Sequence, residues 1–294
     1  MNTIIHGRFS GALAGAFTVG LWGSLPVLRG LAQLPPMLVA ATAMVSATFA
    51  ATVLAHWRRP SATPAPTGAR TQWSCGVAGL VGALYFYFLA LESGDPAQVT
   101  LITYMWPLGF VLLCDRLAGR GLRLATLFGA AIAFAGVAPL LMKDAAGLGM
   151  TPLAFASGLA SGAAWILFSM YLRQVGGLSP VGYRRMFLRA GLVALALHLL
   201  FEQPPGATQL ADWLAAGLIG LGPYGLAFIA WGYALRQGPA TLLGVMTYAV
   251  PIVSATLLVL LGWTAPSAEL LIAAAAVCAG ALVSESPWRR ASAA

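Results

Sequence analysis

Long apolar runs alternate with short charged or Pro/Gly-rich breaks along the whole chain. The runs are close to the length of about 20 residues that an α-helix needs to cross a bilayer. They lie at residues 9–28, 37–57, 73–91, 97–114, 122–142, 152–172, 184–201, 211–235, 240–262 and 267–284. Because the runs are continuous rather than alternating, they favour helices over barrel strands. The pattern predicts an all-α membrane protein with ten transmembrane helices.

Basic residues fall on one side of this predicted arrangement. If the N-terminus is cytoplasmic, only Arg29 and Lys143 of the 16 Lys and Arg residues lie in outer loops. Positive residues collect on the cytoplasmic side of membrane proteins. If the predicted number of helices were wrong by one, every later loop would move to the opposite side of the membrane and this one-sided distribution would be lost. Both chain ends are therefore predicted to be cytoplasmic. The net charge of +8 then follows from topology and does not indicate a nucleic-acid surface.

The two halves of the chain resemble each other. At an offset of 144 residues, Leu91, Gly94, Thr103, Tyr104 and Pro107 align with the identical residues Leu235, Gly238, Thr247, Tyr248 and Pro251. At an offset of 143, Trp22 aligns with Trp165. With five helices in each half, the second half must cross the membrane inverted, as in many secondary transporters. The chain is thus predicted to consist of two inverted five-helix repeats, residues 1–146 and 147–294.

The repeated motif TYxxP places polar groups and a proline inside an apolar helix. A helical proline leaves the carbonyl four residues back without its donor. That carbonyl belongs to Thr103 for Pro107 and to Thr247 for Pro251. Each helix is therefore expected to kink and to present hydroxyl groups and an acceptor on one face. A cavity at the centre of the molecule is one interpretation, and hydrogen bonding between packed helices is the other.

Aromatic residues in the middle of several runs are candidates for the lining of such a cavity. Tyr224, Phe228 and Trp231 share a helix face at i, i+4 and i+7. Ordinary core packing is the alternative reading of this stripe. The candidate substrate-binding residues are Trp22, Tyr87, Thr103, Tyr104, Trp106, Trp165, Tyr224, Trp231, Thr247 and Tyr248, with Pro107 and Pro251 as hinges.

Two further side chains lie near predicted outer helix ends. Arg29 ends the first run and is a candidate contact for a substrate carboxylate, or else a snorkelling interfacial arginine. His198 precedes Glu202 by one helical turn, so it is either a pH-sensing group or an ordinary interfacial residue.

Missing residue types narrow the mechanism. Only 8% of the residues are charged, and no acidic or basic residue lies in the middle of a predicted helix, which disfavours transport driven by a membrane carboxylate. Facilitated diffusion fits better. The three cysteines show no paired spacing, and no cluster predicts a metal site, a catalytic site or a cofactor site. We expect no enzyme activity, no cofactor and no nucleic-acid partner.

These features together resemble the EamA branch of the drug/metabolite transporter superfamily. Within it, LWGSLPVLRG (21–30), TYMWP (103–107) and AWGYALRQGPATLLGVMTYAVPIVSATLL (230–258) are similar to exporters of aromatic amino acids. The resemblance covers nearly the whole chain and implies a central cavity bounded by the predicted helices 1, 3, 4, 6, 8 and 9. Thr103 stands where the resemblance implies asparagine, and a hydroxyl offers fewer hydrogen bonds than an amide.

The resemblance implies a multi-pass protein of a bacterial inner membrane that exports Phe, Tyr and Trp by alternating access. Its partners are then a small-molecule substrate and the lipid bilayer, and a monomer is the default expectation. The alternative is an exporter of the same family that carries other amino acids, metabolites or amphiphilic drugs. Composition and motifs alone indicate only a transporter of a small, partly apolar solute.

Overall fold

The structure is a computed structural model, and it describes residues 2–57, 70, 72–94, 96–119, 124–142, 151–175, 178–263 and 265–285. Lys143 and the predicted boundary between residues 146 and 147 lie outside this part of the chain.

Every regular element among the described residues is a helix. In chain order these are α1 (Asn2–Gly23), α2 (Leu25–Leu31), α3 (Pro36–Trp57), the π-helix η1 (Gln72–Val77), α5 (Ala78–Ser93), α6 (Pro96–Thr103), α7 (Trp106–Leu117), α8 (Leu124–Met142), α9 (Pro152–Gln174), α10 (Pro180–Phe201), α11 (Leu210–Ile219), the π-helix η2 (Gly220–Leu226), α12 (Ala227–Gln237), α13 (Ala240–Met246), α14 (Ala249–Leu260) and α15 (Ala268–Glu285). Each predicted apolar run overlaps one or more of them.

Helices long and apolar enough to cross a membrane recur along the chain. Seven stretches meet this description among the described residues, namely 7–31, 36–57, 74–93, 98–117, 152–174, 210–237 and 240–260. Shorter apolar helices cover 124–139 and 268–284, and α10 carries three arginines in its first half. Phenylalanines and leucines lie exposed on many helices, including Phe9, Phe49 and Phe128. Such a surface fits lipid rather than water, so this is a multi-pass membrane protein.

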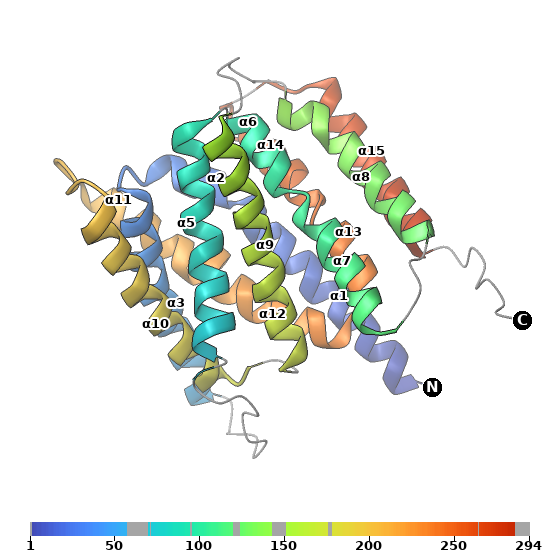
Figure 1. Cartoon of the computed structure of the whole chain (residues 1–294), viewed down its shortest axis with the longest axis horizontal. Coiled ribbons are helices and arrows are strands. Elements are labelled where there is room, and N and C mark those ends of the chain that lie inside the picture. Colours follow the sequence, from blue (N-terminus) through green and yellow to red (C-terminus); the bar gives the residue numbers. More distant parts are fainter. Residues whose placement is uncertain are drawn as a thin grey trace, which may run out of the picture.

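Four helix pairs make the most extensive contacts: α8 with α15, α3 with α10, α5 with α9, and α1 with α12. The α8–α15 pair forms one edge of the molecule, and α3 and α10 lie at the opposite edge (Figure 1). The remaining two pairs occupy the middle. The largest buried cluster extends from α3 and α10 into these central helices and includes the rings of Phe168, Phe228 and Trp231.

Small residues allow the backbones of paired helices to approach closely. A Cβ atom on Gly220 would lie 2.0 Å from the carbonyl oxygen of Ala43, and one on Gly11 would lie 2.5 Å from the amide nitrogen of Gly238. Neither position has room for a side chain. This is the packing that small residues provide between membrane helices in the absence of large side chains.

Both helices that carry TYxxP are interrupted at the motif. Turn residues Tyr104 and Met105 separate α6 from α7, and Thr247 and Tyr248 separate α13 from α14. The expectation of a kink at these positions is therefore confirmed. The first predicted run is present as one stretch, residues 7–31, but its helix is interrupted at Ser24, and Pro26 occupies the first turn of α2. Proline tolerates that position because an amide there has no helical acceptor.

Candidate functional site

Four tryptophans from four helices meet in the middle of the molecule. They are Trp22 on α1, Trp106 on α7, Trp165 on α9 and Trp231 on α12, and we call them the tryptophan cluster. The ring centroids of Trp22 and Trp231 are 5.4 Å apart, and those of Trp22 and Trp165 are 5.9 Å apart. The ring centroid of Trp106 is 6.2 Å from those of both Trp165 and Trp231, so each tryptophan ring contacts two others. These separations are those of favourable aromatic pairs.

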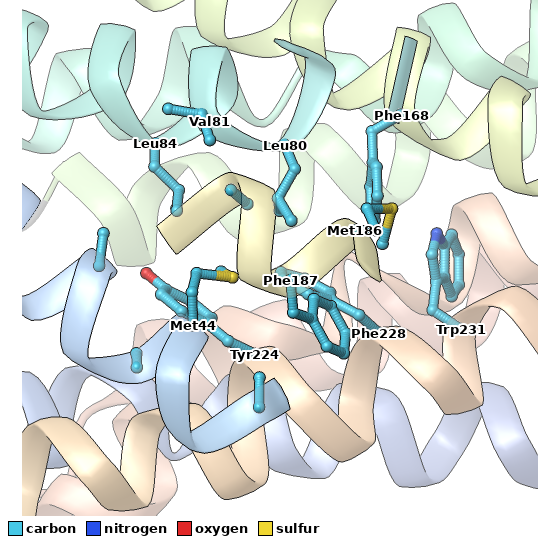
Figure 2. Packing of buried hydrophobic residues seen from close by; sticks show 14 of the residues in the cluster. Met44, Leu80, Val81, Leu84, Phe168, Met186, Phe187, Tyr224, Phe228 and Trp231 are labelled. Carbon is cyan, nitrogen blue, oxygen red and sulfur yellow. The ribbon is translucent and has the colours of Figure 1, made fainter. Parts of the chain in front are cut away.

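Phe228 joins this cluster to a second group of rings. It contacts Trp22 at 6.1 Å and Trp165 at 5.7 Å, and it stacks in parallel on Tyr224 at 5.5 Å with an interplanar angle of 7°. Figure 2 shows Tyr224 and Phe228 next to Phe187. Phe228 was not among the predicted site residues, although its spacing from Tyr224 and Trp231 was the signal that could have identified it.

The indole N–H groups of two of the tryptophans have partners in the protein. Trp22 Nε1 donates to the carbonyl oxygen of Pro223 at 3.1 Å, and Trp231 Nε1 donates to Ser169 Oγ at 3.1 Å. Pro223 lies within the π-helix η2, an element that often marks functional positions. These bonds orient both rings. Because the N–H groups are already used, only the ring faces are available to contact a ligand. Sequence reasoning missed Pro223 and Ser169, because a hydrogen bond between distant helices has no local signature.

The threonines of the two motifs are buried and bonded to backbone carbonyls. Thr103 Oγ1 donates to Gly158 in α9 at 3.4 Å, and Thr247 Oγ1 donates to Gly244 in its own helix at 2.6 Å. The carbonyl of Thr247, predicted to be an unpaired acceptor, in fact accepts the N–H of Val250 at 3.1 Å. That expectation was wrong, because the turn between α13 and α14 supplies a different donor.

Thr103 lies next to the tryptophan cluster. A Cβ atom on Gly162 would lie 3.4 Å from the carbonyl oxygen of Thr103 and 3.5 Å from Cβ of Trp106. The glycine thus allows the break between α6 and α7 to pack directly against α9.

The tyrosines predicted for the site occupy two places. The hydroxyl of Tyr87 is 2.9 Å from Thr100 Oγ1, and Tyr87 lies near both Tyr104 and Tyr224. We call Tyr87, Tyr104 and Tyr224 the tyrosine group. This tyrosine group borders the tryptophan cluster through Tyr224. Tyr248 belongs to another buried cluster, where its ring contacts Phe134 at 6.1 Å. The structure therefore does not bring Tyr248 to the four tryptophans.

The two hinge candidates begin the second halves of their broken helices. Pro107 is the second residue of α7 and follows Trp106, and Pro251 is the third residue of α14. Both are buried. Pro107 faces the second half of the molecule, because a Cβ atom on Gly244 of α13 would lie 3.3 Å from the carbonyl oxygen of Pro107.

Arg29 lies beyond the tyrosine group, at the end of α2. Its guanidinium donates to the carbonyl oxygens of Ala32 and, at 3.2 Å, of Leu34, and it lies near Tyr224. His198 is buried at the end of α10, and its Nδ1 is 2.8 Å from Oε2 of Glu202. The pairing of His198 with Glu202 is thus present, whereas a role in pH sensing stays a hypothesis.

The described residues contain no cluster of side chains that could bind a metal ion. No group of three or more His, Cys, Asp or Glu side chains is close enough there to hold an ion. The site consists of ring faces, hydroxyls and one guanidinium, which together suit an organic solute with an apolar body and a small charged portion.

Comparison with known proteins agrees with this architecture. The model of the EamA-like transporter family matches residues 9–142 and again 150–285. The "Aromatic amino acid exporter YddG" of Ancylobacter novellus is 34% identical over 289 residues, which cover 96% of this chain and 99% of that protein. A solved crystal structure superimposes with a TM-score of 0.85 at 32% identity, over 95% of this chain and 97% of the other. The resemblance noted in the sequence is confirmed, and the chain belongs to the EamA-like transporter family.

Proposed function

We propose that this protein is a secondary transporter that exports aromatic amino acids across the bacterial inner membrane. The observation that carries the proposal is the tryptophan cluster, in which four large ring faces from distant parts of the chain meet at the centre of the helix assembly. The name of the relative from Ancylobacter novellus supports the substrate class. Phe, Tyr and Trp side chains offer the flat apolar surface that such rings bind.

The topology that we propose has ten transmembrane helices in two inverted halves, residues 1–146 and 147–294. The two separate matches to the family support this division. The packing supports it too: an exchange of the halves leaves the pairs α8–α15 and α3–α10 unchanged and converts α5–α9 into α12–α1. The same motif interrupts α6/α7 and α13/α14.

Both chain ends are proposed to be cytoplasmic. The start of α1 and the end of α15 lie toward the same side of the molecule, which supports the placement (Figure 1). Arg29, Glu92 and Glu202 follow the first, third and seventh predicted helices, which end on the outer side when the N-terminus is cytoplasmic, and all three line one common cavity. This supports the assignment of those three helix ends to the same face of the membrane.

Transport would proceed through opening of the tryptophan cluster. Trp22 and Trp106 belong to the first half, and Trp165 and Trp231 belong to the second. Because the rings contact one another across the two halves, a substrate ring can enter only when the halves move apart. Rocking of one half against the other therefore opens the site toward either face in turn. Thr103 and the tyrosine group supply polar contacts nearby, and Pro107 and Pro251 are proposed as flexible points.

The first test is flux of radiolabelled tryptophan and threonine in proteoliposomes that contain the purified protein, with and without an imposed pH gradient. We expect tryptophan flux well above that of empty liposomes and no dependence on the gradient. Flux of threonine without tryptophan would keep the transporter but contradict the aromatic site. A dependence on the gradient would point to a coupling group such as His198.

The hinge proposal predicts a slower cycle when Pro107 is replaced by alanine. The new N–H group can bond to the carbonyl of Thr103 and so favour a continuous helix across the break. We expect Pro107→Ala to lower the turnover rate about tenfold, equivalent to about 1.4 kcal/mol in the barrier, with binding affinity little changed. Initial rates and equilibrium binding measure the two effects separately.

Pro139→Ala serves as the matched control, because Pro139 is an exposed proline inside α8. It should leave turnover unchanged. Unchanged turnover in Pro107→Ala, with the protein inserted normally, would remove the hinge.

A further inference from the structure

A cavity of about 510 Å³ lies beside the end of α2, where α5 and α10 also end and α3 begins. Its walls come from both halves of the molecule and carry charges of both signs: Arg29, Glu92 and Glu202. Its volume is within the usual range for sites that bind small molecules. In the proposed topology this cavity faces away from the cytoplasm. We call it the outer cavity.

The cation of the outer cavity is held in place and has unused donors. Arg29 uses two N–H groups to bond the carbonyls of Ala32 and Leu34, out of the five that a guanidinium offers. No carboxylate among the described residues forms an ion pair with it. A guanidinium with spare parallel donors is the side chain best suited to bind a carboxylate.

The two acidic residues of the outer cavity, Glu202 and Glu92, differ in whether their carboxylates already have partners in the protein. Glu202 is engaged on both oxygens: Oε1 accepts the N–H of Met37 at 2.8 Å, and Oε2 is 2.8 Å from His198 Nδ1. Glu92 is exposed, and no described residue donates a hydrogen bond to it or pairs with it. Glu202 therefore forms part of the wall, whereas Glu92 is available to a ligand.

The outer cavity is also connected to the aromatic site. Arg29 lies near Tyr224. Tyr224 stacks on Phe228 (Figure 2), and Phe228 contacts Trp22 and Trp165 of the tryptophan cluster. The outer cavity therefore lies on the side of the tryptophan cluster that Tyr224 borders.

We propose that the outer cavity is a second binding site, which holds the zwitterionic backbone of an amino acid on the outer side of the tryptophan cluster. Arg29 binds the α-carboxylate and Glu92 binds the α-ammonium group. The cation and the carboxylate of the cavity wall complement the two charges of this zwitterion, whereas a singly charged solute would use only one of them. The substrate class assumed here rests on the proposed function.

The experiment is equilibrium binding of radiolabelled tryptophan to the full-length protein in detergent, with the tryptophan cluster intact or weakened by Trp106→Ala. In the Trp106→Ala background we expect residual weak binding, and Glu92→Gln should weaken it by about threefold, the range of a solvent-exposed ion pair. Competition by indole-3-propionate, which lacks the ammonium group, should be the same with or without Glu92→Gln. Competition by tryptamine, which lacks the carboxylate, should fall in Glu92→Gln.

Glu269→Gln is the control, because it removes a carboxylate at the start of α15 that does not line the cavity. Glu92 makes no contacts that its amide would lose, so folding does not obscure the result. Identical tryptophan isotherms for Trp106→Ala with and without Glu92→Gln would overturn the proposal, as would complete loss of binding in Trp106→Ala alone. If binding depends on Glu92 while the wild-type protein shows no flux, the cavity stands and the proposed transport function fails.

Discussion

Trp106→Ala is expected to lower the flux of tryptophan about tenfold and that of threonine by no more than about twofold, because lost aromatic contacts are worth roughly 0.5–1.5 kcal/mol each. Trp106 contacts the rings of Phe110, Trp165 and Trp231 at 6.2 Å. A threonine side chain has no ring to place against these faces, so its transport depends less on them. Initial rates in proteoliposomes at matched protein content measure the ratio of tryptophan flux to threonine flux for the variant and the wild type.

Two controls separate binding from stability. Trp106 is buried, so its truncation also leaves a void, and each sample must first be shown to be folded and monodisperse. Trp106→Phe keeps an aromatic face and should retain most tryptophan flux. Trp213→Ala removes an exposed tryptophan that is bonded to Thr208, and it should have no selective effect. Equal losses for tryptophan and threonine in Trp106→Ala would contradict an aromatic binding site.

Gly220→Ala is expected to destabilise the folded protein by about 1–3 kcal/mol or more, the cost of inserting a methyl group where there is no room. Its Cβ atom would lie 2.0 Å from the carbonyl oxygen of Ala43 and 2.7 Å from Cα of the same residue. Backbone atoms cannot move aside as the end of a flexible side chain can, so η2 and α3 must separate. The midpoint of thermal unfolding in detergent should fall clearly below that of the wild type.

Gly20→Ala is the matched control for this substitution. Gly20 lies in α1 with nothing within 4 Å of the position of its added Cβ atom. Alanine there should be neutral or should stabilise the helix by up to about 1 kcal/mol, because glycine is the poorer helix former. Equal midpoints for the two variants would show that α3 and η2 do not depend on their close approach.

In the proposed mechanism, the position of the tryptophan cluster links stability to transport. Its rings join α1 and α7 of the first half to α9 and α12 of the second, so contacts that stabilise this arrangement would have to separate for a substrate to pass. Trp22 and Trp231 each keep a hydrogen bond to the protein, to Pro223 and Ser169. We therefore expect movement of whole helices rather than of single side chains.

The helices of this protein were predictable from its sequence, and for a physical reason. Backbone groups in lipid must be satisfied within the segment, so a long apolar run has little choice other than a helix. The interruptions at Tyr104 and Thr247 were equally local, since Pro107 and Pro251 remove a helical donor. Pro26 carried the same signal for the break at Ser24, which was overlooked.

The composition of the site depended on the tertiary structure. Trp22, Trp106, Trp165 and Trp231 were all candidates, but Tyr248 was an equally good one, and only the rotation and packing of the helices brought the four tryptophans together and left Tyr248 against Phe134. Those rotations result from contacts between distant segments, such as Gly220 against Ala43.

The outer cavity illustrates the same division. Arg29 and Glu92 were each assigned to the outer side by counting helices, and nothing in the local sequence relates one to the other. Their presence on the wall of one cavity was decided by the packing of α2, α5 and α10. In this protein, the apolar pattern determined which segments are helices and where they bend, and long-range packing decided which polar and aromatic side chains face each other.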